Sequence, residues 1–420
     1  MRWRCRPGCP KDNLLQTPLM VAENQRGAMY RVVVPNQHNR VTYAELFFDL
    51  VFVYAVTQIS HTLLGHFTPL GAVEVTLLFL AVWWVWVFTA WITNWLNPER
   101  TPVRILLFML MLGGLVLSNS IPEAFEARGL YFACAYAAMQ VGRTAFLLVA
   151  TPPDRTLERH NAIRILAWLS LSAMFWILGG FAEGSPRLVL WAVALAIEYL
   201  SPAVRFWTPG LGASPVDAWA IEGGHMAERF AGFIIIALGE AIVVNATAFS
   251  ELTLTGEAVA AFVSALLTSI AMWWIYFDKG VEAGSELISK STESGRLARL
   301  AYTYLHMPIV AGIILSAVAD ELTLKHPFGH SDPRIVISAV GGPLVFLVGT
   351  ILFKHSIRGF PQLSHCAGII ALVVLACFAH NLSPLALSVV TTVLLMAVAV
   401  WESMSLGGGD GESHPSANSA

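Results

Sequence analysis

Residues 72–95 read AVEVTLLFLAVWWVWVFTAWITNW, an apolar stretch in which Glu74 is the only charged side chain. At a rise of about 1.5 Å per residue, a helix over this stretch would be about 36 Å long. The hydrocarbon core of a bilayer is about 30 Å thick, so a helix of this length can cross it. The stretch therefore predicts a transmembrane helix.

Similar stretches recur along the whole chain. Of its 420 residues, 56% are hydrophobic and only 13% are charged, and the mean hydropathy is +0.63. Soluble domains have about a quarter charged residues. The sequence therefore predicts an all-α integral membrane protein with about twelve transmembrane helices, separated by Pro, Gly or charged residues. The predicted spans are 43–64, 72–95, 103–121, 129–150, 163–181, 187–206, 226–249, 258–279, 299–321, 334–353, 365–381 and 384–402.

The composition and the motifs also exclude several classes of protein. A net charge of -3 provides no basic excess for nucleic-acid binding. Cys5 and Cys9 lack the second ligand pair of a zinc module. The sequence contains no phosphate-binding loop and no zinc-protease or serine-hydrolase motif. We therefore expect no metal, no cofactor and no nucleic acid, and the expected partners are the lipid bilayer and an unidentified small molecule or ion.

The distribution of basic residues predicts the orientation in the membrane. Cytoplasmic loops carry an excess of Lys and Arg. With both termini inside, most of the 25 Lys and Arg residues fall on the inner side. We expect residues 1–40 to form a flexible basic cytoplasmic segment and residues 403–420 to form a flexible Gly/Ser-rich cytoplasmic tail.

Weak internal matches suggest that the chain consists of two similar halves. The Glu45-Leu-Phe stretch of the first span matches Glu228-Arg-Phe in the seventh. The Trp83-Trp84-Val-Trp86 stretch of the second span matches Trp273-Trp274-Ile-Tyr276 in the eighth. A parallel 6+6 repeat would then comprise residues 41–206 and 226–402, joined by a cytoplasmic loop over residues 207–225. Chance similarity between apolar helices is the alternative.

Charged residues inside the first and fourth spans are candidates for an ion pair. An ionisable group inside the bilayer costs free energy, so such a group either forms a structural ion pair or has a function. Glu45 and Asp49 share one face of the first span, because they are four residues apart. Counting the helix rise places Arg143 at about the same depth as Asp49, roughly 10 Å from the inner boundary. We predict an Asp49–Arg143 pair, with a structural and a functional role equally open.

Three further polar residues lie within predicted spans. Glu240 has no Lys or Arg near it in the sequence, so we expect a protonatable group of the kind that proton relays use. Glu198 and His306 extend the candidate relay or substrate path, although for each alone packing or hydrogen bonding between helices is the favoured explanation. The proposed path therefore comprises Glu240, Asp49, Arg143, Glu198 and His306.

A second candidate site lies at the predicted inner ends of the spans. Its members are polar residues that could meet at that face and form a gate or a polar cluster, namely Glu45, His225, Glu228, Arg229 and Asp278. The same residue types could bind a metal. Helix caps and partners of Arg are the commoner reason for such residues at helix ends, so we assign no metal.

The motifs named above resemble a known family. Residues 45–53, ELFFDLVFV, together with Glu228-Arg-Phe, Leu238-Gly239-Glu240 and Trp273-Trp274 before Tyr276-Phe277-Asp278, are similar to the bacterial low temperature requirement A (LtrA) proteins. The resemblance extends from about Arg40 to Trp401. It implies a multi-pass protein of the bacterial inner membrane, associated by name with growth in the cold, and it brings no settled molecular activity. Seven residues occupy family-motif positions: Glu45, Asp49, Glu228, Arg229, Phe230, Glu240 and Asp278.

Three functions are compatible with these features. The first is a proton- or cation-linked secondary permease of unknown substrate, which twelve spans, a duplication and acids in the membrane favour. The second is an intramembrane enzyme that acts on a lipid or terpenoid through inner-face Glu, Asp and His groups. It would need a lipid-accessible cleft that leads to converging carboxylates. The third is a non-transporting sensor or assembly factor, for which the polar groups would be fully paired and no cavity would exist.

Overall fold

The computed structural model describes residues 29–31, 40–215, 219, 221–278, 299–358 and 362–407. Within these residues the chain is helical and forms no β-sheet. Most of the predicted N-terminal segment and of the C-terminal tail lies outside the described residues. The described elements are α2 (Tyr43–Gly65), α3 (Pro69–Trp95), α4 (Thr101–Ser120), η1 (Ile121–Glu123), α5 (Gly129–Ala150), α6 (Thr156–Phe181), α7 (Ser185–Leu200), α8 (Gly223–Ser250), α9 (Gly256–Phe277), η3 (Arg299–Tyr304), α12 (His306–Lys325), α13 (Pro333–Arg358), α14 (Leu363–Phe378), η4 (Ala379–Asn381) and α15 (Pro384–Gly407).

The helices confirm the predicted all-α membrane architecture. In the described part of the chain, 11 helical segments are long and apolar enough to cross a membrane. The remaining predicted span, 187–206, corresponds to α7, which has only 16 residues and ends at Leu200. Arg205 and Phe206 then adopt positive φ angles of 53° and 50°, so the chain turns where a longer helix was expected. At the other end, α15 continues to Gly407, past the predicted start of the tail at residue 403.

Local sequence signals set several helix ends. The hydroxyl of Thr42 accepts a hydrogen bond from the backbone N–H of Glu45, and the Glu45 side chain accepts one from the backbone N–H of Thr42. This capping box satisfies two of the free N–H groups at the start of α2. Thr68 caps α3 in a similar way, and Pro69 begins that helix, where a missing N–H costs nothing.

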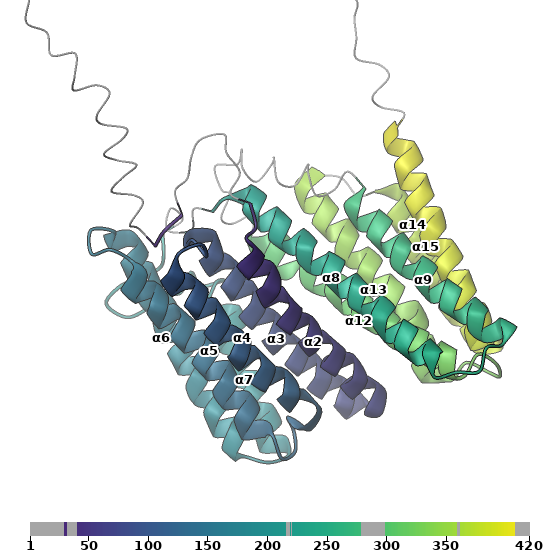
Figure 1. The fold of residues 1–420 in the computed structure, drawn as a ribbon, viewed down its shortest axis with the longest axis horizontal. Helices are drawn as coiled ribbons and strands as arrows, with labels where there is room; N and C mark the ends of the chain where they lie inside the picture. The colour runs from purple at the N-terminus through teal and green to yellow at the C-terminus, as the bar shows by residue number, and fades with distance from the viewer. Residues whose placement is uncertain are drawn as a thin grey trace, which may run out of the picture.

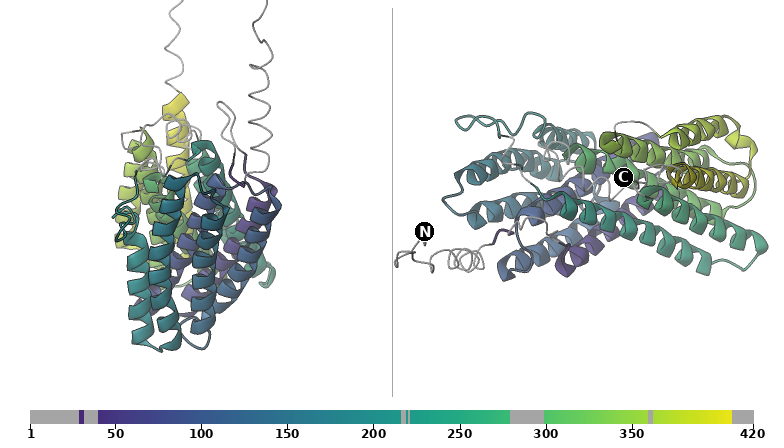
Figure 2. Two further views of the ribbon diagram at one scale, coloured as in Figure 1. Left: turned by 90° about the vertical axis from the view of Figure 1, so that its left-hand side faces the viewer. Right: turned by 90° about the horizontal axis from the view of Figure 1, so that it is seen from above.

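The helices form two groups that lie side by side (Figures 1 and 2). The first group contains α2–α7 and the second contains α8–α15. The groups meet where α2 contacts α8 and α12, and where α3 contacts α8. We call the face at which α2 begins and α15 ends the terminal face, and the opposite face the distal face (Figure 1). The predicted parallel repeat and the predicted cytoplasmic position of the terminal face stay predictions.

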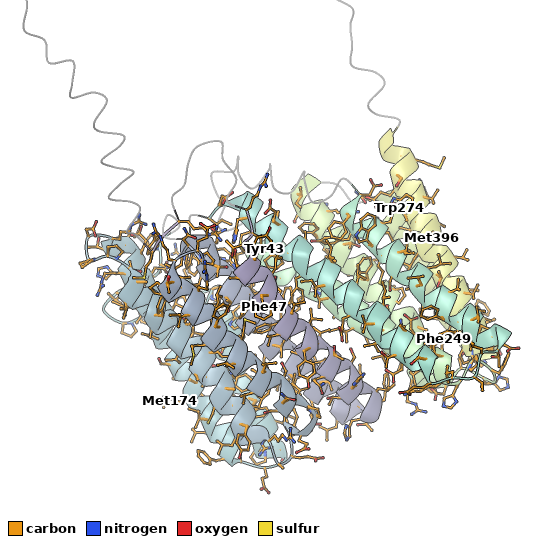
Figure 3. The ribbon with its side chains drawn as sticks, viewed as in Figure 1. Tyr43, Phe47, Met174, Phe249, Trp274 and Met396 are labelled. Carbon is orange, nitrogen blue, oxygen red and sulfur yellow. The ribbon has the colours of Figure 1, made fainter. Side chains whose placement is uncertain are left out.

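The outer surface of both groups is apolar. Large hydrophobic side chains such as Phe47, Met174 and Trp274 project from the helices and are about half exposed (Figure 3). In water such a surface would promote aggregation, whereas in a bilayer it contacts lipid chains. By contrast, α3 is the most enclosed of the membrane-length helices. Apolar helices on the outside, packed around the enclosed α3, are typical of a protein that crosses the membrane many times.

Candidate functional site

A buried charge network at the terminal face begins with Glu45. Its carboxylate is fully buried and lies 3.0 Å from Nη2 of Arg31. It also accepts hydrogen bonds from the backbone N–H of Thr42, at 2.8 Å, and from its hydroxyl, at 2.9 Å. On the other side, Nε2 of His225 on α8 lies 2.9 Å from Oε1 of Glu45. Glu45 therefore links the segment before α2 to the second group of helices.

Both ring nitrogens of His225 have hydrogen-bonding neighbours. The amide Nδ2 of Asn94 on α3 lies 3.1 Å from Nδ1 of the imidazole, and this amide nitrogen can only donate. Nε2 faces both an acceptor, Oε1 of Glu45 at 2.9 Å, and a donor, Nη2 of Arg31 at 2.9 Å. Asn94 also bonds to both the backbone C=O and N–H of Glu222 just before α8. The start of α8 is thus attached to both α2 and α3.

Asp49 forms the second contact between the two groups. Its Oδ2 accepts a hydrogen bond from Nη1 of Arg229 at 3.0 Å, and its Oδ1 lies 2.9 Å from Nη2 of the same guanidinium. The indole N–H of Trp86 on α3 donates to Oδ1 at 2.8 Å. Both charged side chains are fully buried. The Nη1–Oδ2 contact is a charge-assisted hydrogen bond, whereas Nη2 has only an electrostatic contact with Oδ1.

The predicted Asp49–Arg143 pair is therefore wrong. Arg143 on α5 donates instead to the backbone C=O of Val85 and to the hydroxyl of Thr89, both at 2.8 Å, and also to the amide oxygen of Gln140. Asp49 and Arg143 contact neighbouring residues of α3, Trp86 and Val85, but α5 presents Arg143 to α3 within the first group. Arg229, next to the motif residue Glu228, faces Asp49 across the two groups.

Glu198 belongs to the same enclosed cluster as Arg143. Its carboxylate accepts hydrogen bonds from Tyr136 at 2.5 Å and Ser172 at 2.6 Å. The amide of Gln140 donates to it at 3.0 Å and the indole of Trp176 at 3.1 Å. All four donors lie on α5 and α6, so this cluster lies entirely within the first group. The Glu198 carboxylate accepts hydrogen bonds from these four donors and does not contact the second group.

Glu240 and His306 occupy separate places in the structure. Glu240 is partly buried on α8 and accepts a hydrogen bond from the hydroxyl of Thr57 on α2. His306 is fully buried on α12, with Nδ1 2.8 Å from the backbone C=O of Ala301 and Nε2 2.8 Å from the hydroxyl of Tyr276. Because a carbonyl only accepts, Nδ1 donates to it and the Tyr276 hydroxyl donates to Nε2. The structure does not join these residues to Asp49 or Glu198 by direct contacts.

The predicted inner cluster is only partly brought together. Glu45 and His225 are in contact, and Arg229 lies beside Asp49 one helical turn away. Glu228 is exposed and accepts a hydrogen bond from the backbone N–H of Val41. Asp278 accepts one from the hydroxyl of Ser403 on α15, within the second group. In the described part of the chain, no three or more His, Cys, Asp or Glu side chains are placed to hold one metal ion.

Several buried polar contacts were not predicted from the sequence. Arg31, which pairs with Glu45, lies before the first span and carries no motif. Lys354 on α13 pairs with Glu402 on α15 at 2.7 Å, and both are buried. Asp320 on α12 accepts a hydrogen bond from the amide of Asn245 on α8. Asp320 and Glu402 lie near the ends of their predicted spans, where charges are usually solvated, so no sequence pattern indicated their burial.

An apolar cleft lies between the two groups toward the distal face. It has a volume of about 740 Å³ and is lined by α2 and α3 on one side and by α12 and α13 on the other. Its lining includes Leu63, Phe79, Ala311 and Ile314, and Arg334 is the only charged side chain among the described residues that line it. A second hollow of about 550 Å³, between α3 and α7, shares Ala72, Thr76 and Leu80 of α3 with the cleft. Together they form a wide apolar opening around α3.

An aromatic layer closes this opening toward the terminal face. Trp84 of α3 stacks on Tyr199 of α7, with ring centroids 4.1 Å apart. The hydroxyl of Tyr304, at the end of the π-helical turn η3, donates to the backbone C=O of Tyr199 at 3.3 Å. Beyond this layer lies a small cavity of about 20 Å³, lined by residues that include Trp84 and Trp219. A cavity of that volume holds about one water molecule.

The turn η3 is attached to α3 by two tryptophans. The indole N–H of Trp83 donates to the backbone C=O of Thr303 at 2.8 Å, and that of Trp91 donates to the hydroxyl of Thr303 at 3.1 Å. π-Helical turns are rare and are frequent at functional sites. The layer between the cleft and the terminal face is therefore built from both groups of helices.

Comparison with known proteins identifies the family. The model of the family described as bacterial low temperature requirement A protein (LtrA) matches residues 40–400. An uncharacterized protein from Rhizobium meliloti is 42% identical over 369 residues, which cover 87% of this chain and 90% of that protein. No solved structure matches the chain. The family match includes the cleft and, apart from Arg31, the charge network. The chain therefore belongs to the bacterial low temperature requirement A family of multi-pass membrane proteins.

Proposed function

We propose that this protein is a secondary permease that works by alternating access between the two groups of helices. The observation that supports this function is the asymmetry of the interface between the groups. Toward the distal face the groups diverge around an apolar cleft of about 740 Å³. Toward the terminal face buried charges hold them together, through Glu45 with His225 and Asp49 with Arg229. Such an arrangement corresponds to a carrier that is open on one side and closed on the other.

The lining of the cleft indicates the class of substrate. Its walls are apolar side chains, and Thr68, Thr76 and Arg334 are the polar ones. The guanidinium of Arg334 is already paired with Asp332 at 2.8 Å. An apolar pocket binds apolar surface and discriminates poorly in favour of charged solutes. We therefore expect a largely apolar or amphiphilic substrate, coupled to a proton or another cation.

The intramembrane enzyme is less well supported than the permease. It would need carboxylates or histidines that converge on a lipid-accessible cleft. The cleft is lined by no Asp, Glu or His among the described residues. The buried acids at the terminal face lie behind the aromatic layer and are engaged by Arg and His side chains. A sensor would not require the cleft at all, so the cleft favours the permease over the third alternative as well.

Transport can be tested with purified protein in proteoliposomes that contain a pH-sensitive dye. Cell extract separated into polar and apolar fractions would be added outside, and dye signal and lumenal contents would be measured. We expect the apolar fraction to drive a proton flux in the wild type that Glu240→Gln abolishes. Glu251→Gln, which changes an exposed acid just after α8, is the matched control and should retain the flux.

The outcome that contradicts the proposal is equally specific. If the folded wild-type protein moves neither protons nor any component of either fraction, at any imposed membrane potential, it is not a permease of this kind. Correct folding would be checked by circular dichroism and by elution as a single species in detergent.

A further inference from the structure

A buried carboxylate in the second group of helices has an unusual set of neighbours. Asp320 on α12 is 7% exposed, and Asn245 on α8 is 2% exposed. The amide Nδ2 of Asn245 donates to Oδ2 of Asp320 at 3.1 Å. The amide oxygen Oδ1 of Asn245 is buried and has no hydrogen-bond partner among the described residues. The pair thus contains one acid and one unsatisfied acceptor.

Asp320 has no cationic partner in the described part of the chain. Asn245 provides its only hydrogen bond there. The next residue, Glu321, pairs with Lys325 at 2.6 Å, so that cation is already engaged. The helices packed against α12 carry four charged or potentially charged groups in their distal halves, namely His61 on α2, Glu240 on α8, Glu257 on α9 and Arg334 on α13. Among the described residues, none of these groups forms an ion pair with Asp320. The distal half of α15 carries no charged side chain.

The hydrogen-bond inventory favours the neutral form of this acid. An ionised carboxylate that is buried without a counter-charge is costly, and one amide N–H does not replace its hydration. A protonated carboxyl has an O–H to donate, and an amide oxygen is a good acceptor. If the O–H of Asp320 donates to Oδ1 of Asn245 while Nδ2 donates to Asp320, both side chains are satisfied by two parallel hydrogen bonds. Addition of one proton to the carboxylate thus removes both the buried charge and the unsatisfied acceptor.

We propose that Asp320 and Asn245 form a proton-binding site, in which Asp320 holds the proton and Asn245 positions and stabilises the neutral acid. The site lies on α8 and α12, and α2 contacts both of these helices. Glu240 is five residues before Asn245 on α8, which corresponds to about 8 Å along the helix axis. If Asp320 couples transport to proton movement, the proton is the ion that drives transport. This coupling role rests on the proposed permease function, whereas proton binding by Asp320 and Asn245 is independent of that function.

Infrared difference spectroscopy of the full-length protein in proteoliposomes tests the site directly. A protonated carboxyl has a carbonyl band separate from that of a carboxylate, and the band shifts in D₂O. We expect the wild type to show such a band at neutral pH and Asp320→Asn to lose it. Glu321→Gln, which changes the neighbouring ion-paired acid, should keep the band. Asn245→Ala should keep the band at a shifted frequency, because the acid loses its amide acceptor.

Each result has a definite meaning. A spectrum from which Asp320→Asn removes no protonated-acid band would overturn the proposal, since Asp320 would then be ionised. Should Asp320→Asn fail to fold, the frequency shift in Asn245→Ala decides the question in the same way. If the band is assigned but the wild type transports nothing, the proton site stands and the permease function fails. If flux in the wild type is proton-linked and Asp320→Asn uncouples it, both are supported.

Discussion

Two buried charge clusters lie within one protein and differ in what they connect. The Glu198 cluster joins α5, α6 and α7 inside the first group, and fixed donors engage both oxygens of its carboxylate. The terminal-face network joins α2 and α3 to α8 across the two groups. Buried polar networks that are fully satisfied make a structure rigid. The comparison teaches that the first cluster holds one group together, whereas the second holds the two groups against each other.

The largest expected effect comes from removal of the Glu198 carboxylate. Glu198→Ala leaves four donors without their acceptor and opens a cavity, so we expect a loss of about 5 kcal/mol in the free energy of unfolding. Equilibrium unfolding in detergent micelles measures the loss. Glu183→Ala, which changes an exposed acid in the loop before α7, should have no measurable effect. A loss below 1 kcal/mol for Glu198→Ala would show that the cluster is not structural.

Removal of the Asp49 carboxylate from the terminal-face network should cost less stability than Glu198→Ala and should also change the conformation. Asp49→Ala leaves the Arg229 guanidinium buried without its counter-charge, which costs about 3 kcal/mol. The groups can relieve this cost by separating and admitting water, so we expect faster amide hydrogen exchange at the starts of α2 and α8. Glu198→Ala should not produce this local change.

The double variant Asp49→Ala/Arg229→Leu sharpens the same comparison. Removal of both charges should recover most of the stability that the single variant loses, because no unpaired ion remains. Glu228→Ala, at an exposed neighbour of Arg229, is the control. If the double variant is no more stable than Asp49→Ala, the ion pair does not account for the loss.

Loss of the Thr42 cap should weaken the terminal-face network only slightly. Thr42→Ala removes the hydroxyl that bonds to Glu45 and caps α2, which costs about 1 kcal/mol. Thr255→Ala removes the equivalent cap of α9, away from the network, and should cost about the same stability. Only Thr42→Ala should also increase hydrogen exchange at the start of α8. Equal exchange in both variants would contradict a role of the cap in the network.

The smallest effect is expected at Asp332, in the loop before α13 and outside both clusters. Partial burial opposes its ionisation, but hydrogen bonds from Arg334 and the backbone N–H of Ile335, with the charge of Arg334, lower the pKa of the carboxyl below its usual value. A lowered pKa stabilises the folded state above the ordinary pKa of about 3.9, and the contribution is lost as the pH falls through the folded-state pKa. Because the pair is exposed, we expect less than about 1 kcal/mol.

Thermal unfolding of the wild type and Asp332→Asn at several pH values measures that contribution. Asn can still cap the helix, so the difference between the two proteins reports the charge alone. We expect the wild type to be slightly more stable at pH 7, and the two proteins to converge at acid pH. A difference that stays constant across the pH range would contradict the assignment to ionisation.

The sequence predicted where the helices lie along the chain well, but it predicted poorly which helices contact one another. Apolar length and helix breakers placed most span ends within about five residues. The exceptions are α6, which begins earlier than predicted at Thr156, and α7, which ends at Leu200. The rise per residue predicted similar levels for Asp49 and Arg143, and the two contact the neighbouring residues Trp86 and Val85 of α3. Depth does not say which helix lies alongside or how it is rotated about its axis. Arg143 therefore faces α3 and the Glu198 cluster, while Arg229 from a distant part of the chain meets Asp49.

The candidate site depends on contacts between groups that no local pattern encodes. The family motif around Glu45 and Asp49 marked the correct region of α2, and His225 was correctly placed near Glu45. Asp320 was missed because it lies five residues before Lys325, where a charge is expected to reach the membrane surface. Its burial results from packing of α12 against α8 and α13.

The cleft-lining side of α3 winds around that helix. Ala72, Thr76 and Leu80 line the apolar opening, Trp84 belongs to the aromatic layer, and Trp95 lines the small cavity. At about 100° per residue, the 23 steps from Ala72 to Trp95 amount to six turns and about 140° more. The apolar opening and the small cavity, the two compartments beside α3, therefore lie on different sides of this helix. The indole N–H groups of Trp83, Trp86 and Trp91 on α3 donate to Thr303 and Asp49. These hydrogen bonds restrain the rotation of α3 about its axis, and with it the width of both compartments.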